Sequence, residues 1–272
     1  MKTILITGAS SGIGKATATH FLDQGWNVIA TMRRPEDAGE LNDHANAFVV
    51  ALDVTNNASI SDAVAAGVAR FGQIDVLLNN AGYGAYGPLE AFSMERIERV
   101  FDTNVIGLLA VTKAVIPHMR ERQSGTIINV SSVGGQLAFP TGTLYHGTKF
   151  AVEGLSESLH YELAPLGIRL RIVQPGMVKT NFGGSSFDRA VDETLPDYDE
   201  TIAGTGRMFG TLVDNPAEPE AIAQVIWDAA NDNSDRLRYR AGDDAAIALL
   251  DVRKLQDDET FITGMKNRMS VQ

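Results

Sequence analysis

Short β-branched apolar runs alternate along this chain with longer amphipathic stretches, and this alternation restricts the possible folds more than any other feature. The runs predict strands at Thr3–Thr7, Asn27–Met32, Ala47–Leu52, Ile74–Asn79, Thr126–Ser131 and Arg169–Gln174. The stretches between them predict helices at Lys15–Gln24, Ser59–Phe71, Met94–Arg120 and Lys149–Pro165. Strands that are joined by helices pair in parallel, and right-handed crossovers place helices on both faces. We therefore predict an α/β fold built on a doubly wound parallel sheet.

The sequence changes character after the sixth predicted strand. Residues 177–215 are rich in glycine, serine and carboxylates. Helix and strand patterns return at Ala221–Ala230 and Leu237–Arg240, and we expect a helical tail from Asp243. The prediction is one domain over residues 1–272 with about seven strands, in which 177–215 form a loop insertion over the carboxyl edge of the sheet. Such long loops are commonly lids or substrate-binding segments, and a solvated acidic loop without function is the alternative.

The turn between the first predicted strand and the first predicted helix is rich in glycine and reads Thr7-Gly8-Ala9-Ser10-Ser11-Gly12-Ile13-Gly14. Backbone N–H groups at a helix start have no helical partner, and the helix dipole there favours negative charge. Glycine lets the backbone turn tightly and approach a pyrophosphate closely. The turn therefore predicts a phosphate cradle, with a plain strand–helix connection as the alternative.

Composition excludes several classes of partner and chemistry. The formal net charge of −11 disfavours binding to nucleic acid. The chain has no cysteine, which excludes disulfides and thiolate catalysis, and its 44% hydrophobic content suits one large core. The first predicted strand starts at Thr3, so we expect no signal peptide. We also expect no membrane span and a cytoplasmic protein, since Lys113 interrupts the apolar run from Val105 to Pro117.

Three polar residues downstream form a candidate acid–base group. Tyr145 and Lys149 are four residues apart, so they share one face of a helix that includes both. An ammonium beside a phenol favours the phenolate, so we expect the pKa of Tyr145 to be lowered. Ser132 ends the fifth predicted strand, where ligands of parallel sheets gather, and its hydroxyl could hold a substrate oxygen. The alternative for the Tyr145–Lys149 pair is ordinary surface packing.

With these motifs in order, the chain resembles the classical short-chain dehydrogenases/reductases. The matching motifs are the glycine turn Thr7 to Gly14, Asn79-Asn80-Ala81-Gly82, Asn104, Ser132 placed 13 residues before the tyrosine, Tyr145-x-x-x-Lys149, and Pro175-Gly176 with Thr180. The resemblance covers residues 1 to about 182 closely and extends to about 242 more loosely. It implies a Rossmann-type sheet and an enzyme that transfers a hydride between a nicotinamide cofactor and a carbonyl or alcohol.

The resemblance also implies roles for individual residues. Tyr145 would be the general acid and base, Lys149 would lower its pKa and hold the nicotinamide ribose, and Ser132 would orient the substrate oxygen. Asn104 would hold a water that extends the proton relay through Lys149. Asp53 would contact the adenine amino group, and the alternative for Asp53 is an N-terminal helix cap.

The predicted cofactor-binding residues are Gly8, Ser10, Ser11, Gly12, Ile13, Gly14, Arg33, Arg34, Asp53, Val54, Asn80, Ala81, Gly82, Tyr145, Lys149, Pro175, Gly176, Val178 and Thr180. Enzymes that prefer NAD carry an acid after the second strand, whereas NADP enzymes need positive charge there for the 2′-phosphate. The resemblance to the family places Met32 where the acid would be and Arg33 directly after it, and Arg34 follows. We therefore predict NADP(H) as the preferred cofactor, with NAD(H) possible, because Ser11 stands where some NADP enzymes carry a basic residue. The alternative is that both arginines belong to a solvated turn.

The substrate is expected to be a mostly apolar, small-molecule carbonyl compound. Its predicted contacts are Ser132, Gly134, Gln136, Tyr145, Met177 and Phe182, with Phe139, Tyr83 and Tyr86 as further candidates. Reduction is the expected physiological direction. Two alternatives remain, namely a non-catalytic dinucleotide-binding sensor or scaffold, and an epimerase that uses the cofactor transiently.

Histidine spacing gives no sign of a metal site, so none is predicted, and His146 could rim the pocket. The resemblance further implies a homodimer or homotetramer that pairs through the helices predicted at Met94–Arg120 and Lys149–Pro165.

Overall fold

The computed structural model of the chain describes residues 1–180, 186–212, 215–242 and 245–270. Its strands are β1 (Thr3–Thr7), β2 (Asn27–Met32), β3 (Ala47–Ala51), β4 (Val76–Asn79), β5 (Gly84–Tyr86), β6 (Gly125–Val130), β7 (Ile168–Pro175), β8 (Phe187–Arg189) and β9 (Arg238–Ala241). Its helices are α1 (Gly12–Asp23), α2 (Asn57–Phe71), α3 (Met94–Phe101), α4 (Gly107–Arg122), α5 (Thr143–Leu163), α6 (Asp199–Leu212), α7 (Pro219–Asn231), α8 (Ala245–Leu255) and α9 (Asp258–Met269).

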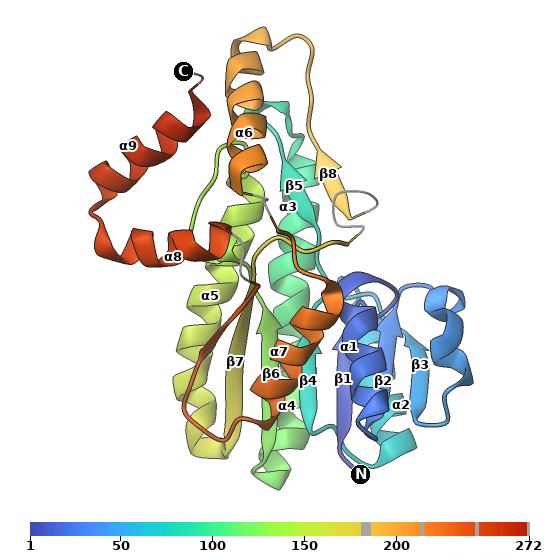
Figure 1. The fold of residues 1–272 in the computed structure, drawn as a ribbon. Coiled ribbons are helices and arrows are strands. Elements are labelled where there is room, and N and C mark those ends of the chain that lie inside the picture. The colour runs from blue at the N-terminus through green and yellow to red at the C-terminus, as the bar shows by residue number, and fades with distance from the viewer. Residues whose placement is uncertain (181–185, 213–214, 243–244, 271–272) are drawn as a thin grey trace.

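Seven strands form one central sheet in the order β3-β2-β1-β4-β6-β7-β9, and every neighbouring pair is parallel (Figure 1). The strand order reverses beside β1, where Ile4 pairs with Val28 on one side and Val76 on the other. The carboxyl ends of strands at such a reversal leave a crevice in which ligands bind. The predicted Rossmann-type sheet is confirmed.

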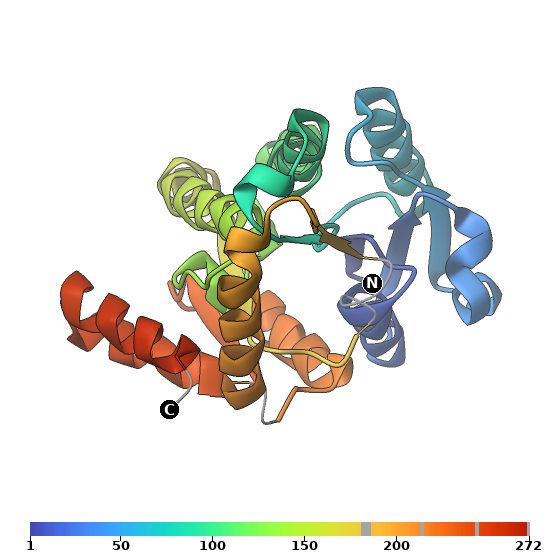
Figure 2. The same cartoon turned by 90° about the horizontal axis from the view of Figure 1, so that it is seen from above.

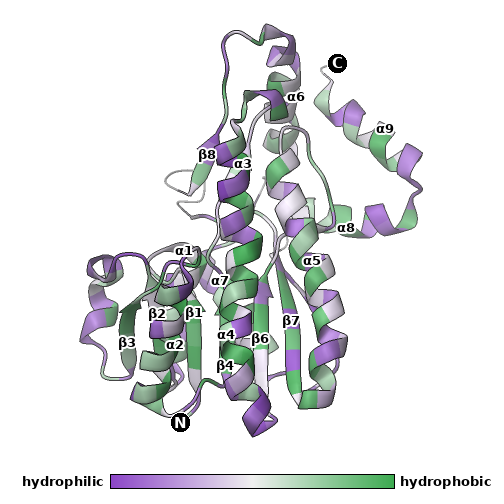
Figure 3. Cartoon of the chain, turned by 180° about the vertical axis from the view of Figure 1, so that it is seen from behind, coloured by the Kyte–Doolittle hydropathy of each residue, from purple (hydrophilic) through white to green (hydrophobic). Residues whose placement is uncertain are grey.

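Helices cover both faces of the sheet, because successive side chains of a strand point to opposite sides. On one face, Ile4 and Ile6 pack in a core shared with α1 and α7. On the other face, Leu5 packs in a core with residues of α2 and α4, such as Ile60 and Val111. Figure 3 shows the strands predominantly green, as expected of a sheet that is buried on both sides.

The helix predicted over Met94–Arg120 is divided into two. Helix α3 ends at Phe101, a π-helical turn follows at Asp102–Ile106, and α4 continues from Gly107. Short π-turns inside helices occur often at functional sites, because they turn a side chain out of the regular helical position. Asn104, one of the predicted site residues, lies in this turn.

The continuous helical stretch Met94–Arg122 is long and apolar enough to cross a membrane, with a mean hydropathy of 1.4 over its most apolar window. This differs from the expectation that no segment of the chain reaches that length. Here the apolar side of α4 is buried, since Val111, Val115 and Met119 are fully covered in the core against the sheet. A core helix of an α/β protein passes the same test, so the stretch carries no argument for a membrane.

The segment 177–215, predicted as a loop, contains regular structure. Strand β8 pairs in parallel with β5, and α6 is a helix of 14 residues. Both lie beyond the carboxyl edge of the central sheet, and Figure 2 shows α6 crossing above it. Helices α8 and α9 complete this cap, in which Met208, Leu250 and Phe261 share a small apolar core.

Candidate active site

A cavity of about 990 Å³ lies at the carboxyl edge of the sheet. One end is lined by the glycine turn and by the ends of the central strands, and the other by residues of α3, β5, β8, α6 and α8. The predicted site residues that line it are Gly8, Ser10, Ser11, Gly12, Ile13, Arg33, Asp53, Val54, Asn80, Ala81, Gly82, Ser132, Gly134, Tyr145, Lys149, Pro175, Gly176, Met177, Val178 and Thr180. The cavity has the size expected of a small-molecule and cofactor site.

Glycine is required at several points of the turn after β1. Gly8 and Gly12 have φ angles of 71° and 53°, a region that side chains rarely adopt. Gly14 has no space for a side chain, because an added Cβ would lie 2.2 Å from the carbonyl oxygen of Gly8. Gly14 therefore shapes the turn from behind and does not itself line the cavity.

The amino terminus of α1 is left available for a ligand. Ser11 is the N-cap residue and makes no side-chain capping hydrogen bond. The Asn80 side chain instead fixes the turn, with Nδ2 donating to the carbonyl oxygens of Thr7 and Gly8 at 2.9 and 3.2 Å. Uncapped N–H groups, a helix dipole and close backbone approach all fit the pyrophosphate of a dinucleotide.

The two adjacent arginines after β2 have different surroundings. Arg33 is exposed and lines the cavity, whereas Arg34 pairs with Asp37, its Nε lying 2.9 Å from the carboxylate. Arg34 therefore does not reach the cavity in this structure. Asp53 lines the cavity, and the N-cap of α2 is Asn56, so the cap proposed as the alternative role of Asp53 is filled by another residue.

Tyr145, Lys149 and Ser132 line the cavity next to one another. All three side chains are almost fully buried, and the Ser132 side chain is hydrogen-bonded to the Tyr145 phenol. Lys149 lies one turn further along α5, with Nζ 5.8 Å from the centroid of the Tyr145 ring. The Lys149 Nζ also donates to the carbonyl oxygen of Val130 at 2.9 Å.

The pKa of Tyr145 differs from the expectation based on its spacing from Lys149. Burial raises the pKa of Tyr145, and the hydrogen bond from Ser132 only partly opposes this effect. Burial also lowers the pKa of Lys149 to about 8. The prediction of a lowered pKa for Tyr145 is therefore wrong for this structure, because desolvation of the buried phenolate raises the pKa more than the Ser132 hydrogen bond lowers it.

Asn104 supports the site from behind and does not line the cavity. Its Nδ2 donates to the Tyr83 carbonyl oxygen at 2.9 Å and to Thr148 Oγ1 at 3.1 Å, and its Oδ1 accepts from the Tyr83 N–H at 3.0 Å. These bonds tie the loop after β4 to α5 beside Tyr145. The contacts are those of a residue that positions its neighbours.

Aromatic rings line the far end of the cavity. Tyr86 stacks on Phe187 with centroids 5.2 Å apart and lies 5.4 Å from the Tyr145 ring. Phe139 and Phe209 pack together at 5.5 Å. Met177 and Gly134 also contribute, whereas Gln136 does not line the cavity and Phe182 lies outside the described residues. This end suits an apolar ligand.

His146 rims the same end and stays neutral. Its Nδ1 lies 3.0 Å from the Gly134 carbonyl oxygen, which can only accept, so Nδ1 carries the proton. Burial lowers the pKa of His146 to about 4, against the opposing effect of that hydrogen bond. Within the described ranges, no group of three His, Asp or Glu side chains is arranged to hold a metal ion.

Several residues that line the cavity were not predicted from the sequence, namely Arg99, Thr103, Phe187, Asp188, Phe209, Leu212 and Ala246. They come from segments that the motifs do not mark. One signal was available, since Arg99 and Thr103 are four residues apart and share one helix face. No local pattern shows that this face meets β8.

Comparisons with known proteins agree with this geometry. The family model for short chain dehydrogenase matches residues 2–190. An uncharacterized oxidoreductase of Schizosaccharomyces pombe is 40% identical over 240 residues, which is 88% of this chain and 100% of the relative. A solved short-chain dehydrogenase from Streptomyces avermitilis is 36% identical with a TM-score of 0.85, covering 98% of this chain and 96% of that one. ElxO, solved with NADP bound, is 28% identical with a TM-score of 0.72, covering 88% and 97% respectively.

Proposed function

The chain belongs to the short-chain dehydrogenase family and is an oxidoreductase, and from this premise we propose that it interconverts a carbonyl group and a secondary alcohol with NADP(H). The observation that carries the proposal is the hydrogen-bonded Ser132–Tyr145 pair in the cavity that also contains the glycine turn. A proton donor and a dinucleotide cradle in one cavity are the two parts that this reaction needs.

NADP(H) is the cofactor that the residues fit best. The uncapped start of α1 and the fixed turn before it suit the pyrophosphate, and Arg33 presents a permanent positive charge at the edge of the cavity beside β2. Bound NADPH supplies a hydride to a carbonyl carbon. Among the proteins of similar structure, ElxO is known with NADP bound, which supports this choice of cofactor.

In reduction, Tyr145 gives its phenolic proton to the carbonyl oxygen as that oxygen gains negative charge. A raised pKa keeps Tyr145 protonated before the reaction, which is the form that can donate. When the substrate binds, Ser132 can turn its one hydroxyl proton from Tyr145 to the same oxygen and so stabilise the developing charge. In oxidation, the same groups act in reverse, and Tyr145 takes the proton of the alcohol.

Lys149 and Asn104 act around this pair. Lys149 is buried beside Tyr145, and its ammonium offers hydrogen bonds to the ribose next to the nicotinamide. Asn104 holds the loop after β4 against α5, which keeps the tyrosine in position. The apolar rings around Tyr86 then accept an apolar part of the substrate.

The decisive experiment follows NADPH oxidation by absorbance across a panel of ketones and aldehydes, with wild-type protein and a Tyr145→Phe variant. We expect Tyr145→Phe to lose at least about 1,000-fold in kcat while it binds NADPH with unchanged affinity. Unchanged turnover in the variant would refute the role of Tyr145. Absence of turnover by the wild type, with NADPH still bound, would instead indicate a dinucleotide-binding sensor, and substrate isomerisation without net NADPH consumption would indicate an epimerase.

We also propose that the protein forms a homodimer or homotetramer through α4 and α5. Apolar side chains are exposed on α5, namely Phe150, Leu155 and Tyr161. Exposed apolar groups on neighbouring turns favour association. Light scattering on the purified protein should give a multiple of 29.2 kDa, and a single-chain mass would refute the proposal.

A further inference from the structure

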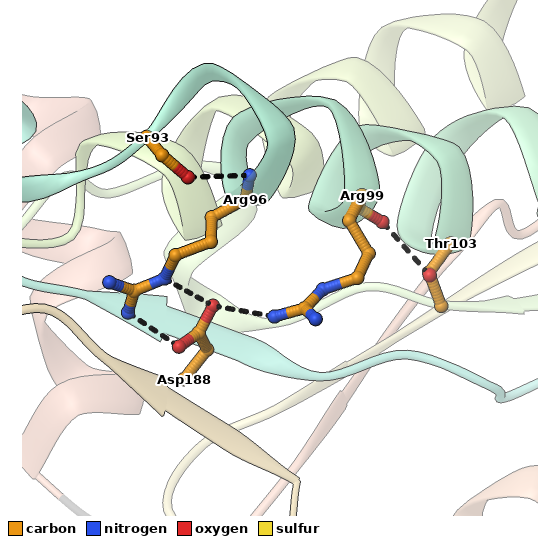
Figure 4. Close-up of polar contacts among 5 residues, drawn as sticks. All are labelled: Ser93, Arg96, Arg99, Thr103 and Asp188. Carbon is orange, nitrogen blue, oxygen red and sulfur yellow. Dashed lines mark hydrogen bonds and ion pairs between the residues drawn. The ribbon is translucent and has the colours of Figure 1, made fainter.

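Arg96, Arg99 and Asp188 form a charged cluster (Figure 4). It lies at the end of the cavity that the aromatic rings line, which we call the substrate end. Asp188 of β8 lies against one face of α3, where Arg96 and Arg99 both pair with its carboxylate. Ser93 caps the start of the helix through the Arg96 N–H, and the Thr103 hydroxyl donates to the Arg99 carbonyl oxygen at 2.9 Å. The cluster is thus held on a well-formed helix and is not a flexible surface contact.

The two arginines of the cluster are engaged differently. Arg96 binds Asp188 through two nitrogens, Nη2 at 2.6 Å and Nε at 3.2 Å, and its guanidinium stacks over Phe92. Arg99 reaches the same carboxylate through Nη2 alone at 3.2 Å, and its side chain is 58% exposed. Arg96 therefore holds the carboxylate with its fork, whereas Arg99 shares it through one nitrogen and also hydrogen-bonds the Tyr83 side chain. The other N–H groups of the Arg99 guanidinium are left to bind a ligand.

Arg99 faces the cavity and carries a net positive charge. Arg99, Thr103 and Asp188 line the cavity, and Arg96 does not. One carboxylate faces two guanidinium groups, so the cluster keeps one positive charge in a protein whose formal net charge is −11. Contact with Tyr83 and pairing with Asp188 raise the pKa of Arg99, so it is charged at every physiological pH.

A continuous apolar wall connects this charge to the reacting group. Phe187, the neighbour of Asp188, stacks on Tyr86, and Tyr86 in turn lies 5.4 Å from Tyr145. A ligand whose carbonyl meets Tyr145 would therefore pass along two rings before it reaches Arg99. Such a path suits an apolar chain with a charged far end.

We propose that the substrate carries a carboxylate at the end remote from its reacting carbonyl, and that Arg99 binds this carboxylate. The substrate class is then an oxo acid with an apolar spacer, or the corresponding hydroxy acid. A carboxylate fits better than a phosphate dianion, because Asp188 beside Arg99 repels a second negative charge. This inference rests on the proposed function and adds the chemistry of the substrate to it.

The test uses a series of straight-chain oxo acids in which the oxo group is moved along the chain, each paired with its neutral methyl ester. For the best acid we expect wild-type kcat/KM to exceed that of its ester about 10-fold or more, since a charge-assisted bond is lost in the ester. Arg99→Gln should lower kcat/KM for the acid by about the same factor and leave the ester unchanged. Arg99→Lys, which keeps the charge but not the fork, should retain part of the preference.

A matched control is Arg120→Gln, which also removes one positive charge. Arg120 is an exposed residue of α4 that does not line the cavity. Its ratio of acid to ester should equal that of the wild type. An equal effect of both variants, or a wild-type enzyme that uses esters as well as acids, would overturn the inference.

Failure of the proposed function gives a different result. If wild-type protein with NADPH turns over neither acids nor esters, the oxidoreductase proposal for carbonyl substrates fails. Calorimetric titration of the same oxo acids into the NADPH-loaded protein then still tests whether Arg99 binds a carboxylate. Binding that Arg99→Gln weakens about 10-fold supports the carboxylate site, and equal binding to both proteins refutes it.

Discussion

The two ends of the cavity are built from different parts of the protein. The cofactor end is mostly backbone, formed by the glycine turn after β1 and by the ends of the central strands, with Asn80 bonded to two carbonyl oxygens of that turn. The substrate end is mostly side chains, where Tyr86, Phe187 and Phe209 meet from β5, β8 and α6. The first end belongs to the sheet, and the second belongs to the cap above it.

This difference teaches which part of the site can change. A backbone cradle depends on the path of the main chain, so it tolerates few substitutions and binds a ligand of fixed shape. A wall of side chains from separate segments can be altered one residue at a time without moving the sheet. We expect the cofactor end to respond sharply to small changes and the substrate end to respond gradually.

The largest effect on cofactor binding is expected from Gly14→Ala, at the cofactor end. Its added methyl group would lie 2.2 Å from the Gly8 carbonyl oxygen and 2.6 Å from Asn80 Nδ2, so the turn must move. A displacement of this kind should weaken NADPH binding by about 100-fold or more. Fluorescence titration with NADPH measures the change, and circular dichroism shows whether the variant is folded.

Gly154→Ala is the matched control, because Gly154 is also inside a helix but has open space around an added Cβ. Removing a helical glycine there should leave NADPH affinity unchanged and stabilise the protein slightly. If Gly14→Ala binds NADPH as the wild type does, the cofactor end does not respond sharply to a small substitution, and the expected difference between the two ends is wrong.

The cofactor end could be predicted from the sequence because its determinants are local. The turn from Thr7 to Gly14 contains all the glycines that it needs, and the strand that precedes it lies where its apolar run indicates. The parallel sheet follows from the alternation of strands and helices, and the observed strands agree with it. The glycine requirement at Gly14 is visible in the motif even before the contact with Gly8 is known.

The substrate end could not be predicted in the same way. Asp188 and Arg99 are far apart in the sequence, and only the pairing of β8 with β5 brings them together. Helix α6 escaped prediction because its many glycines and threonines disfavour a helix, and burial of Met208 and Leu212 in the cap core compensates. The pKa of Tyr145 also depended on burial, which spacing within one helix does not report.

A second prediction concerns His146 at the substrate end, whose pKa is lowered by burial from 6.5 to about 4. Between these pH values the unfolded chain binds a proton at this position and the folded protein does not, so stability falls as the pH falls. The loss should reach about 3 kcal/mol at pH 4 and about 2 kcal/mol at pH 5 relative to pH 7.5. Urea unfolding at the three pH values measures it.

His146→Gln separates this effect from the titration of carboxylates. The variant cannot gain a proton at this position, so its stability should fall less than that of the wild type between pH 7.5 and pH 5. The quantity to compare is the difference between the two proteins' losses, which removes any constant cost of the substitution. Identical losses in both proteins would mean that the ring at the substrate end is not held neutral by its surroundings.

The smallest effect is expected from Arg33→Gln, which tests a part of the cofactor end that depends on a side chain. Arg33 lines the cavity while its neighbour Arg34 pairs with Asp37, so the structure itself provides the control, Arg34→Gln. Loss of one charge-assisted contact to the 2′-phosphate should weaken NADPH binding about 10-fold and leave NADH binding unchanged. Arg34→Gln should change neither affinity.

Paired titrations of NADPH and NADH into the wild type and the two variants measure these affinities. An equal loss for NADPH and NADH in Arg33→Gln would show that Arg33 does not bind the 2′-phosphate. Equal effects of the two variants would show that the turn after β2 acts through its total charge. NADPH binding would then not depend on one specific side chain after β2.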